Sequence, residues 1–283
     1  MRIILSRKGF DSSAGGVASP IFADGSMVSL PIPERDTGVC YGDLAWRGEP
    51  LAPVIEQLTK GKVPARYGVH MDPDLEAGTL PRAPGWRPSL GQVGAAQTVL
   101  SRAGVGPGDL FLFFGWFKEV AESGDALRYV RGAPQLHVLF GWLQVGEVIS
   151  LANDAHPTWA SGHPHVAVPD RQHNTLYVAA DHLSLGGTRL DAPGAGVFQQ
   201  YRSELCLTMT GQHKRSCWDL PGWMLPADGK PTLGYHDNKS RWTRSGDRVQ
   251  LDSVARGQEF VLDVGQQPKA MTWIRKLMRG RTA

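Results

Sequence analysis

Two long hydrophobic runs stand out along the chain, at residues 108–117 and 136–149, and each is broken by a Gly-Trp dipeptide. Both runs are rich in aromatic and β-branched residues, a composition that fits strands on a half-buried pleated sheet. Glycine inside a strand usually marks a bulge or a close backbone approach. We therefore predict two neighbouring strands that turn a sheet corner, bring the indoles of Trp116 and Trp142 near one mouth, and leave a slot for a flat ligand.

The rest of the chain mixes short apolar segments with segments of helical period. At residues 49–60 and 271–279 apolar side chains recur three and four positions apart, which is typical of one buried helix face. At residues 89–103 a serine after a proline offers a helix cap, and Gly104 offers a stop. We predict helices over these three segments and further strands over residues 2–5, 19–21, 27–33, 175–180, 204–210 and 260–264.

The order of these elements predicts an α+β fold with a curved, mostly antiparallel sheet and flanking helices. No internal repeat, low-complexity tract or clear linker interrupts the chain. A length of 283 residues is compatible with one large domain or two ordinary ones. Since no boundary is visible, we predict a single elaborated domain over residues 1–283.

Composition narrows the function classes. The formal charge is 30 − 27 = +3, which tolerates a polyanionic partner but lacks the dense basic stripe of a dedicated duplex-DNA binder. Three cysteines without a CxxC pair argue against a disulfide framework and favour a reducing cytoplasm. No apolar stretch has membrane-spanning length, and the start of the chain is too short for a signal-peptide core. We expect a cytoplasmic protein without a membrane partner.

The first candidate site is the polar, glycine-bearing loop at residues 6–16, which follows the opening strand. Backbone N–H groups with a nearby Lys or Arg can neutralise a phosphate, although no Walker A motif occurs here. The alternative is an ordinary surface turn with solvated charges. The candidate ligand-binding residues are Arg7, Lys8, Asp11 and Ser12, and Asp11 is also a candidate catalytic residue.

The second candidate is formed by His70, Asp72 and Asp74. Residues two apart in an extended chain lie on one side, so an imidazole and two carboxylates at this spacing can hold a divalent cation. Asp-Pro-Asp is also a common turn sequence, and the turn is the favoured interpretation.

The third candidate is the pair His163 and His165, with His156 and His173 close in sequence. An H-x-H pair can bind zinc if a third ligand comes from elsewhere, and a histidine can also act as a general base near neutral pH. A hydrogen-bonding loop that lines a cleft is the third interpretation, and it is favoured because Pro164 separates the pair and no cysteine is near.

The fourth candidate is the loop at residues 211–223, where basic side chains alternate with indoles. A cation suits a phosphate and an indole suits a stacked base. The alternative is that the indoles pack beneath a proline-rich loop and the basic residues are solvated. The candidate ligand-binding residues are His213, Lys214, Arg215 and Trp218.

These segments carry a family resemblance. Residues 1–16, 19–21, 30–33, 70–74 and 215–221, together with the two hydrophobic runs, resemble the nucleotide modification associated domain family, third type. The resemblance spans most of the chain and implies association with systems that make or handle modified bases in DNA, in bacteria and their phages. It implies no particular catalytic residues.

Residues 108–150 alone are also similar to the strand pair of PUA-like barrels, including the ASCH and EVE groups. Those modules bind modified bases or RNA in a pocket at the side of the barrel. This similarity implies a barrel core around residues 105–210 and makes Trp116 and Trp142 a candidate stacking wall.

We predict that the protein binds or processes a nucleotide, or a modified base in nucleic acid, as part of a DNA-modification system. One alternative is a metal- or histidine-dependent nucleotide-modifying enzyme, for which a divalent metal is the implied cofactor. Another is a non-catalytic subunit that meets other modification-system proteins. The sequence does not distinguish DNA from RNA or identify the base.

Overall fold

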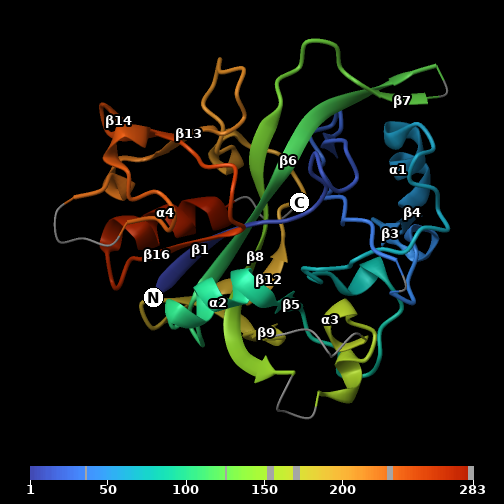
Figure 1. Cartoon of the computed structure of the whole chain (residues 1–283), viewed down its shortest axis with the longest axis horizontal. Coiled ribbons are helices and arrows are strands. Elements are labelled where there is room, and N and C mark those ends of the chain that lie inside the picture. Colours follow the sequence, from blue (N-terminus) through green and yellow to red (C-terminus); the bar gives the residue numbers. More distant parts are fainter. Residues whose placement is uncertain (36, 125, 152–155, 168–172, 228–231, 280–283) are drawn as a thin grey trace.

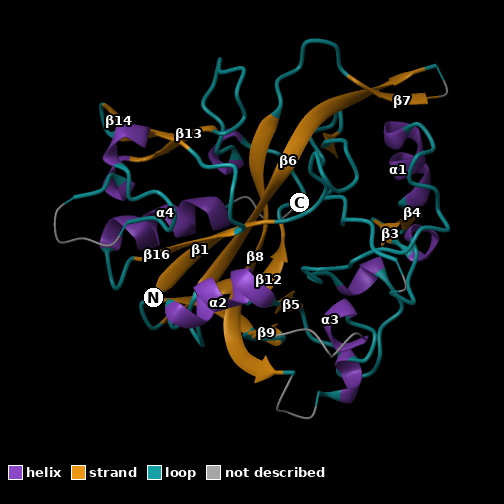
Figure 2. Cartoon of the chain, viewed as in Figure 1, coloured by secondary structure: helices purple, strands orange, loops and turns teal. Residues whose placement is uncertain are grey.

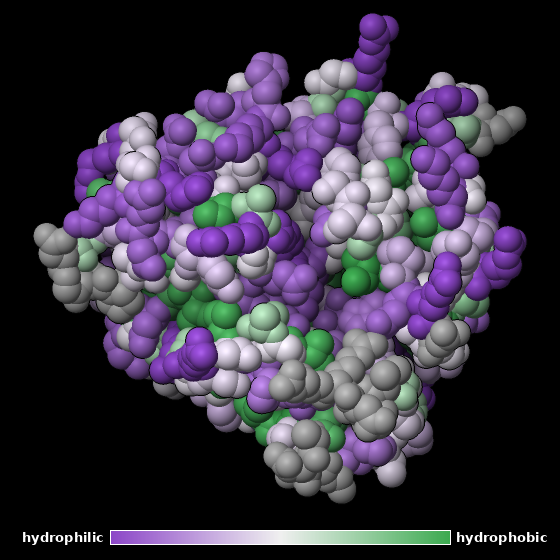
Figure 3. Space-filling model, viewed as in Figure 1, coloured by the Kyte–Doolittle hydropathy of each residue, from purple (hydrophilic) through white to green (hydrophobic). Residues whose placement is uncertain are grey.

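The computed structural model describes residues 1–35, 37–124, 126–151, 156–167, 173–227 and 232–279. The chain is α+β with mostly antiparallel sheets, as predicted, and its helices lie around the strands (Figure 2). Within the described residues, no helix combines the length and hydrophobicity needed to cross a membrane. The face shown in Figure 3 is mostly hydrophilic, with small separate hydrophobic areas.

One large sheet organises the molecule, and β6 crosses the centre of the view (Figure 1). β1 pairs with β6 in parallel, whereas β16 and β8 continue the sheet with antiparallel neighbours. The sheet is open, because β16 and β5 are its two end strands, so the expected PUA-like barrel does not close. Its strand order is β16 (Glu259–Asp263), β1 (Arg2–Arg7), β6 (Leu110–Ser123), β8 (Leu136–Ser150), β9 (Thr175–Ala179) and β5 (Ser89–Gln92).

Smaller elements surround this sheet. β2 (Ser19–Ile21) and β7 (Ala126–Tyr129) pair with β6, and β12 (Ala195–Val197) pairs with β8. The separate sheets are β13 (Cys217–Pro221), β15 (Arg248–Asp252) and β14 (Trp242–Ser245); β10 (His182–Leu185) and β11 (Thr188–Pro193); and β3 (Ala45–Trp46) and β4 (Glu49–Pro50). The α-helices are α1 (Ala52–Thr59), α2 (Gly94–Arg102), α3 (Pro164–Ala167) and α4 (Pro268–Met278).

The two Gly-Trp breaks are explained by the pairing of β6 with β8. The register shifts between Phe113 and Phe114, whose partners are Gly141 and Leu139, so one extra residue bulges on β8. Gly115 lies against the backbone that follows β1, and a Cβ added there would sit 3.0 Å from the carbonyl oxygen of Lys8. The prediction that these glycines mark a bulge and a close backbone approach is confirmed.

The helix predicted over residues 89–103 begins only at Gly94. The residues before it form β5, which pairs with β9 through Ser89 to Gln92. Gly91 is a poor helix former and Gly94 has a φ of 58°, outside the right-handed helical region, so the helix does not extend back to Ser89 and the strand pairing is preferred. Ser89 is therefore a buried strand residue, and the prediction that it caps the helix was wrong.

Two predicted strands are also corrected. Residues 204–210 contain a short 3-10 helix and only two isolated bridges, at Cys206 and Thr208. Within residues 27–33 only Met27 and Pro33 make isolated bridges, because two prolines in this segment lack the N–H that a ladder needs. The helices expected at 49–60 and 271–279 are present as α1 and α4, with α1 starting after the short strand β4.

Trp218 lies at the centre of the core between the main sheet and β13–β15. It is completely buried, and its ring centroid lies 5.1 Å from that of Phe114 and 6.0 Å from that of Phe260. Its indole Nε1 donates a hydrogen bond of 3.0 Å to Nδ1 of the buried His137. The indole therefore supports the fold and has no face open to a ligand.

The environment of His137 predicts a pH-dependent stability. Burial, with smaller contributions from the charges of Arg215 and Arg7, lowers the pKa of His137 to about 3. The unfolded chain binds a proton at this histidine below about pH 6.5, whereas the folded chain does not until about pH 3. Each pH unit of acidification between these values therefore lowers the free energy of unfolding by up to about 1.4 kcal/mol. His137→Asn keeps an acceptor for Trp218 and should reduce this slope between pH 6 and about 4, measured by urea unfolding. Equal slopes in both proteins would contradict the assignment.

Candidate functional site

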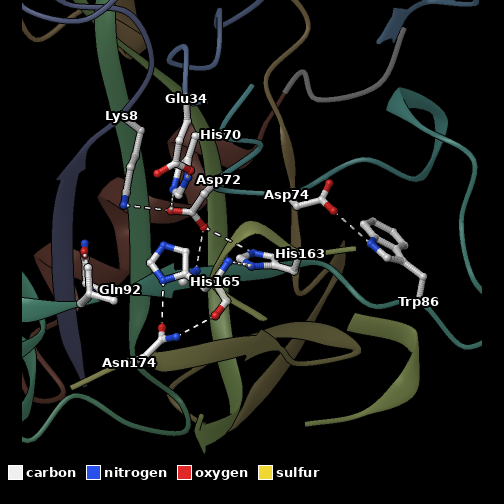
Figure 4. Close-up of polar contacts among 12 residues, drawn as sticks. Lys8, Glu34, His70, Asp72, Asp74, Trp86, Gln92, His163, His165 and Asn174 are labelled. Atoms are coloured by element: carbon white, nitrogen blue, oxygen red, sulfur yellow. Dashed lines mark hydrogen bonds and ion pairs between the residues drawn. The ribbon is translucent and has the colours of Figure 1, made fainter. Parts of the chain in front are cut away.

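Four residues from two predicted candidates meet in one buried cluster, shown in Figure 4. His70 and Asp72 come from the loop before β5, whereas His163 directly precedes α3 and His165 lies in it. All four side chains are buried. One ligand atom from each of His70, Asp72 and His165 lies within 4.8 Å of the others. The structure therefore joins segments that are about ninety residues apart in sequence.

Asp72 is the anionic centre of this cluster. Its Oδ1 accepts a 2.6 Å hydrogen bond from the backbone N–H of Gly91, and its Oδ2 lies 3.3 Å from the Lys8 ammonium. Burial alone would raise the pKa of the Asp72 carboxyl, but the charge of Lys8, the neighbouring His163 and His165 outweigh it and hold the pKa well below its usual range. Asp72 is therefore ionised at neutral pH.

The imidazole of His70 is oriented by Glu34. Its Nδ1 lies 2.5 Å from Glu34 Oε2, and a carboxylate accepts at that distance, so the ring carries its proton on Nδ1. The lone pair of Nε2 then faces the cluster, 3.9 Å from Asp72 Oδ2. Metal-ligating histidines show this arrangement, in which the second ring nitrogen donates to a carboxylate or carbonyl.

His165 is oriented in the same way by Asn174. The side-chain Nδ2 of Asn174 donates to the carbonyl oxygen of His165 at 2.6 Å, which leaves Asn174 Oδ1 as the acceptor for His165 Nδ1 at 3.0 Å. The proton of His165 is therefore on Nδ1 and its Nε2 is free to ligate. Burial lowers the pKa of His165 to about 4, so the ring is neutral at pH 7, the state that binds a metal.

His163 has the opposite tautomer. Its Nδ1 accepts a 3.2 Å hydrogen bond from the backbone N–H of His165, so a neutral ring carries its proton on Nε2. That Nε2 lies 3.5 Å from Asp72 Oδ1, beyond good hydrogen-bond geometry. His163 is thus suited to hold or move a proton beside the cluster, and not to ligate a metal through Nε2.

Two imidazoles and one carboxylate are a donor set typical of divalent transition metals, and they leave coordination positions open. Bonds from such ions to nitrogen and oxygen are about 2.0–2.2 Å long, so two ligand atoms of one tetrahedral ion lie about 3.3–3.6 Å apart. The ligand atoms of His70, Asp72 and His165 lie within 4.8 Å of one another, so the widest separation must close by about 1 Å or more if it is near that limit. Side-chain rotations of that size would let the three residues hold one ion.

Lys8 links this cluster to a second buried carboxylate, Glu259. The Lys8 ammonium lies 3.9 Å from Glu259 Oε1, and the same oxygen accepts from Ser6 Oγ at 3.0 Å and Gln92 Nε2 at 2.6 Å. Burial raises the pKa of the Glu259 carboxyl above its usual range. Lys8, predicted as a phosphate ligand, instead lies between two internal carboxylates.

Asp74, predicted as a metal ligand, does not join the cluster. Its two oxygens accept from the guanidinium of Arg82 at 2.6 and 2.7 Å, and Oδ2 also accepts from Trp86 Nε1 at 3.1 Å. This carboxylate is already satisfied, because both oxygens are engaged. The third ligand position is taken by His165, which the sequence analysis had placed in a different candidate site.

Gly91 gives the cluster a sharp test. Its N–H holds Asp72, and a Cβ added at Gly91 would lie 2.2 Å from the ring carbons Cγ and Cδ2 of His165. Gly91→Ala should push His165 out of place and lower metal affinity at least about 10-fold, the effect typical of disturbing ligand orientation. Isothermal titration with Zn²⁺ measures this. Gly78→Ala, where an added Cβ meets nothing within 4 Å, is the control, and unchanged affinity in Gly91→Ala would contradict the geometry.

A second group of predicted residues also comes together. The Arg215 guanidinium lies 4.4 Å above the ring of Trp116, which is half-buried. Burial lowers the pKa of Arg7, with Asp11 opposing and the positive charge of Arg215 adding to the shift. Arg7 also donates to the carbonyl oxygens of Ala255 and Gly257. Arg7, Arg215 and Trp116 thus share one cationic surface, here called the Arg7–Arg215 patch.

The remaining predicted ligand residues lie elsewhere. Trp142 is only 1% exposed and its Nε1 donates to the carbonyl oxygen of Pro193, so the predicted stacking wall is corrected to the single half-buried indole of Trp116. Lys214 is exposed and pairs with Asp252 at 2.6 Å, and His213 and Ser12 are exposed.

Three contributors were missed by the sequence analysis. Glu34, Asn174 and Glu259 orient or surround the cluster from three different segments. A lone Glu or Asn far along the chain gives no local signal, because such residues are common on surfaces. Only the fold shows that each one faces a buried imidazole or ammonium group.

Comparison with known proteins gives one match. The family model described as nucleotide modification associated domain 3 matches residues 2–263, a range that contains every residue of the cluster and of the Arg7–Arg215 patch. The comparison found no match among curated proteins and none among solved structures.

Proposed function

The chain belongs to the nucleotide modification associated domain 3 family, and from this premise we propose that it processes a nucleotide, or a modified base within nucleic acid, at a metal centre formed by His70, Asp72 and His165. One observation carries the proposal. The two imidazoles have their Nδ1 atoms engaged by Glu34 and Asn174, and this leaves two Nε2 lone pairs beside a buried, ionised carboxylate.

The charge of the cluster supports a cation. The carboxylate of Asp72 lies within it and that of Glu34 faces His70, whereas Lys8 supplies one ammonium group between Asp72 and Glu259. Buried carboxylates are costly unless cations or hydrogen bonds compensate them. A divalent ion at this place would compensate the negative charge and polarise a bound water or substrate oxygen. His163, with its proton on Nε2, would stand next to that ion as the proton carrier.

The test is turnover with defined metals. Purified protein is stripped with a chelator, reloaded with Zn²⁺, Mn²⁺, Co²⁺ or Fe²⁺, and incubated with deoxynucleotides and with oligonucleotides bearing unmodified or modified bases. We expect a mass change in one substrate that needs the reloaded metal and is lost in His70→Ala. The control His156→Ala changes an exposed histidine of the same sequence cluster and should stay active. If stripped protein or His70→Ala is as active as the reloaded wild type, there is no metal centre here.

A second candidate function is favoured by the Arg7–Arg215 patch. A guanidinium stacked on an indole suits a nucleic-acid backbone with an adjacent base. Side chains alternate along β1, so Arg7 leaves the strand on the face opposite to Ser6, whose hydroxyl bonds to Glu259 beside Lys8. The patch would then bind nucleic acid without taking part in chemistry.

Binding through the patch should depend on salt, because each neutralised phosphate releases counterions. We expect Arg215→Ala to weaken binding of a single-stranded oligonucleotide and to make its salt dependence shallower. The variant Arg244→Ala removes an exposed arginine on β14 and serves as the control. Identical salt dependence in wild type and Arg215→Ala would contradict nucleic-acid binding through the patch.

A further inference from the structure

A cavity of about 530 Å³ opens beside the metal cluster. His163 lies in its wall, together with residues 159–164 on one side and residues 80–83 and 86 on another. The volume is within the range of small-molecule sites. Since His163 lines this cavity and its Nε2 lies 3.5 Å from Asp72 Oδ1, a ligand in the cavity would lie next to the proposed metal centre.

Two polar atoms of the cavity wall lack partners. Among the described residues, Ser89 Oγ and His163 Nε2 are buried atoms that make no hydrogen bond, and both residues line this cavity. Ser89 is 1% exposed and His163 is 5% exposed. Buried donors and acceptors without partners are rare in folded proteins and cost free energy. Both residues line one cavity, so a ligand bound there is the nearest source of the missing partners.

The same wall carries two indoles, Trp86 and Trp159. Trp86 is fixed in place, because its Nε1 donates to Asp74 at 3.1 Å and Arg82 lies 4.3 Å above its ring. The backbone of Asp74 in turn pairs with that of Ser89 through two hydrogen bonds of 2.9 Å. The indole and the unpartnered hydroxyl are therefore linked through the pairing of Asp74 with Ser89, the first residue of β5.

The charge of the wall distinguishes a base from a phosphate. Arg82 donates to both oxygens of Asp74 and to the carbonyl oxygens of Glu76 and Ala77, so four of its five N–H donors are engaged within the protein. Arg82 is the only Lys or Arg among the described lining residues, and a second carboxylate, that of Asp43, also lines the wall. A wall with this charge fits an uncharged heterocycle better than an anion.

We infer that this cavity binds the nucleobase of the substrate. The base lies against the indoles of Trp86 and Trp159, and its polar edge bonds to Ser89 Oγ and His163 Nε2. This inference rests on the proposed function, because it places the base where His163 and the metal can reach it. It makes Trp86 and Ser89 specificity residues that neither the sequence motifs nor the family match identifies.

The experiment measures binding separately from chemistry. Affinities of the four deoxynucleoside 5′-monophosphates, of 5-methyl-dCMP and of a single-stranded oligonucleotide are measured by calorimetry for wild type, Trp86→Ala, Trp86→Phe and Ser89→Ala. Loss of one base-stacking contact should weaken the best probe about 5- to 150-fold in Trp86→Ala. Trp86→Phe should recover part of the affinity, and Ser89→Ala should lose about 2- to 10-fold. Melting temperature and Zn²⁺ stoichiometry show that each variant is folded and keeps its metal.

Trp223→Phe, which changes an indole that packs against Trp273 and does not line the cavity, is the control and should bind as wild type does. If Trp86→Ala and Ser89→Ala bind every probe as tightly as wild type, or if no probe binds the wild type, the inference is wrong and the metal centre stands. If binding depends on Trp86 but no metal supports turnover, the proposed function fails and the base site stands.

Discussion

Replacing His165 by alanine is expected to lower the affinity for Zn²⁺ by more than about 100-fold and to abolish turnover. A lost partner behind a ligand typically costs about 10- to 100-fold in metal affinity or activity, and His165 supplies a ligand atom itself. Equilibrium dialysis against Zn²⁺ measures the affinity directly. The melting temperature of the stripped variant shows whether its fold is intact.

A graded series makes this result specific. Asn174→Ala keeps the imidazole of His165 but removes the acceptor at 3.0 Å from its Nδ1, so affinity should fall about 10- to 100-fold, less than in His165→Ala. His156→Ala changes an exposed histidine and should leave affinity unchanged. If His165→Ala and His156→Ala retain Zn²⁺ equally well, His165 is not a ligand.

Truncating Trp218 to alanine is expected to lower the free energy of unfolding by about 3–5 kcal/mol, the range for removing a large aromatic side chain from a core. The indole is completely buried, and its removal also leaves Nδ1 of the buried His137 without its donor. Urea unfolding followed by circular dichroism measures the change. A loss below about 1 kcal/mol would contradict the core role.

The conservative variant separates a structural role from a ligand role at Trp218. Trp218→Phe keeps most of the packing and should cost about 1–3 kcal/mol, mainly because a buried acceptor loses its hydrogen bond. Its nucleotide affinity should equal that of wild type at a temperature where both proteins are folded. Weaker nucleotide binding by folded Trp218→Phe would show that Trp218 contributes to the binding site.

The two longest strands could be predicted from the sequence, because long apolar runs rich in aromatic and β-branched residues indicate buried strands. β6 and β8 have long apolar runs, and their glycines marked the bulge and the close approach to Lys8. The segment that became β5 was predicted as a helix, since four residues of a buried edge strand resemble the start of a helix when only their polarity is known. The pairing partner β9 decides between them, and it lies far along the chain.

The candidate site was predicted in parts but not as a whole. The sequence marked His70, Asp72, His163 and His165 as unusual, yet assigned them to two separate sites and preferred a turn and a hydrogen-bonding loop. Spacing along an extended chain favoured Asp74 as the third ligand. In the fold, the guanidinium of Arg82 engages that carboxylate instead.

The tautomers of the histidines could not be predicted from the sequence at all. They depend on which group faces each Nδ1, and those groups are Glu34, Asn174 and a backbone N–H. The base-binding cavity could not be predicted either, because it depends on contacts between distant segments. Trp86 lies in a loop and Trp159 in a short 3-10 helix, and only the fold places both indoles beside His163.

The most direct measurement is the metal content and coordination of protein loaded with Zn²⁺ and freed of excess ion, by elemental analysis and X-ray absorption spectroscopy. The account predicts one ion per chain, held by nitrogen and oxygen ligands that include two imidazoles, and loss of that ion in His165→Ala. Protein that retains no ion, or His165→Ala that retains one ion with the same spectrum, would contradict it.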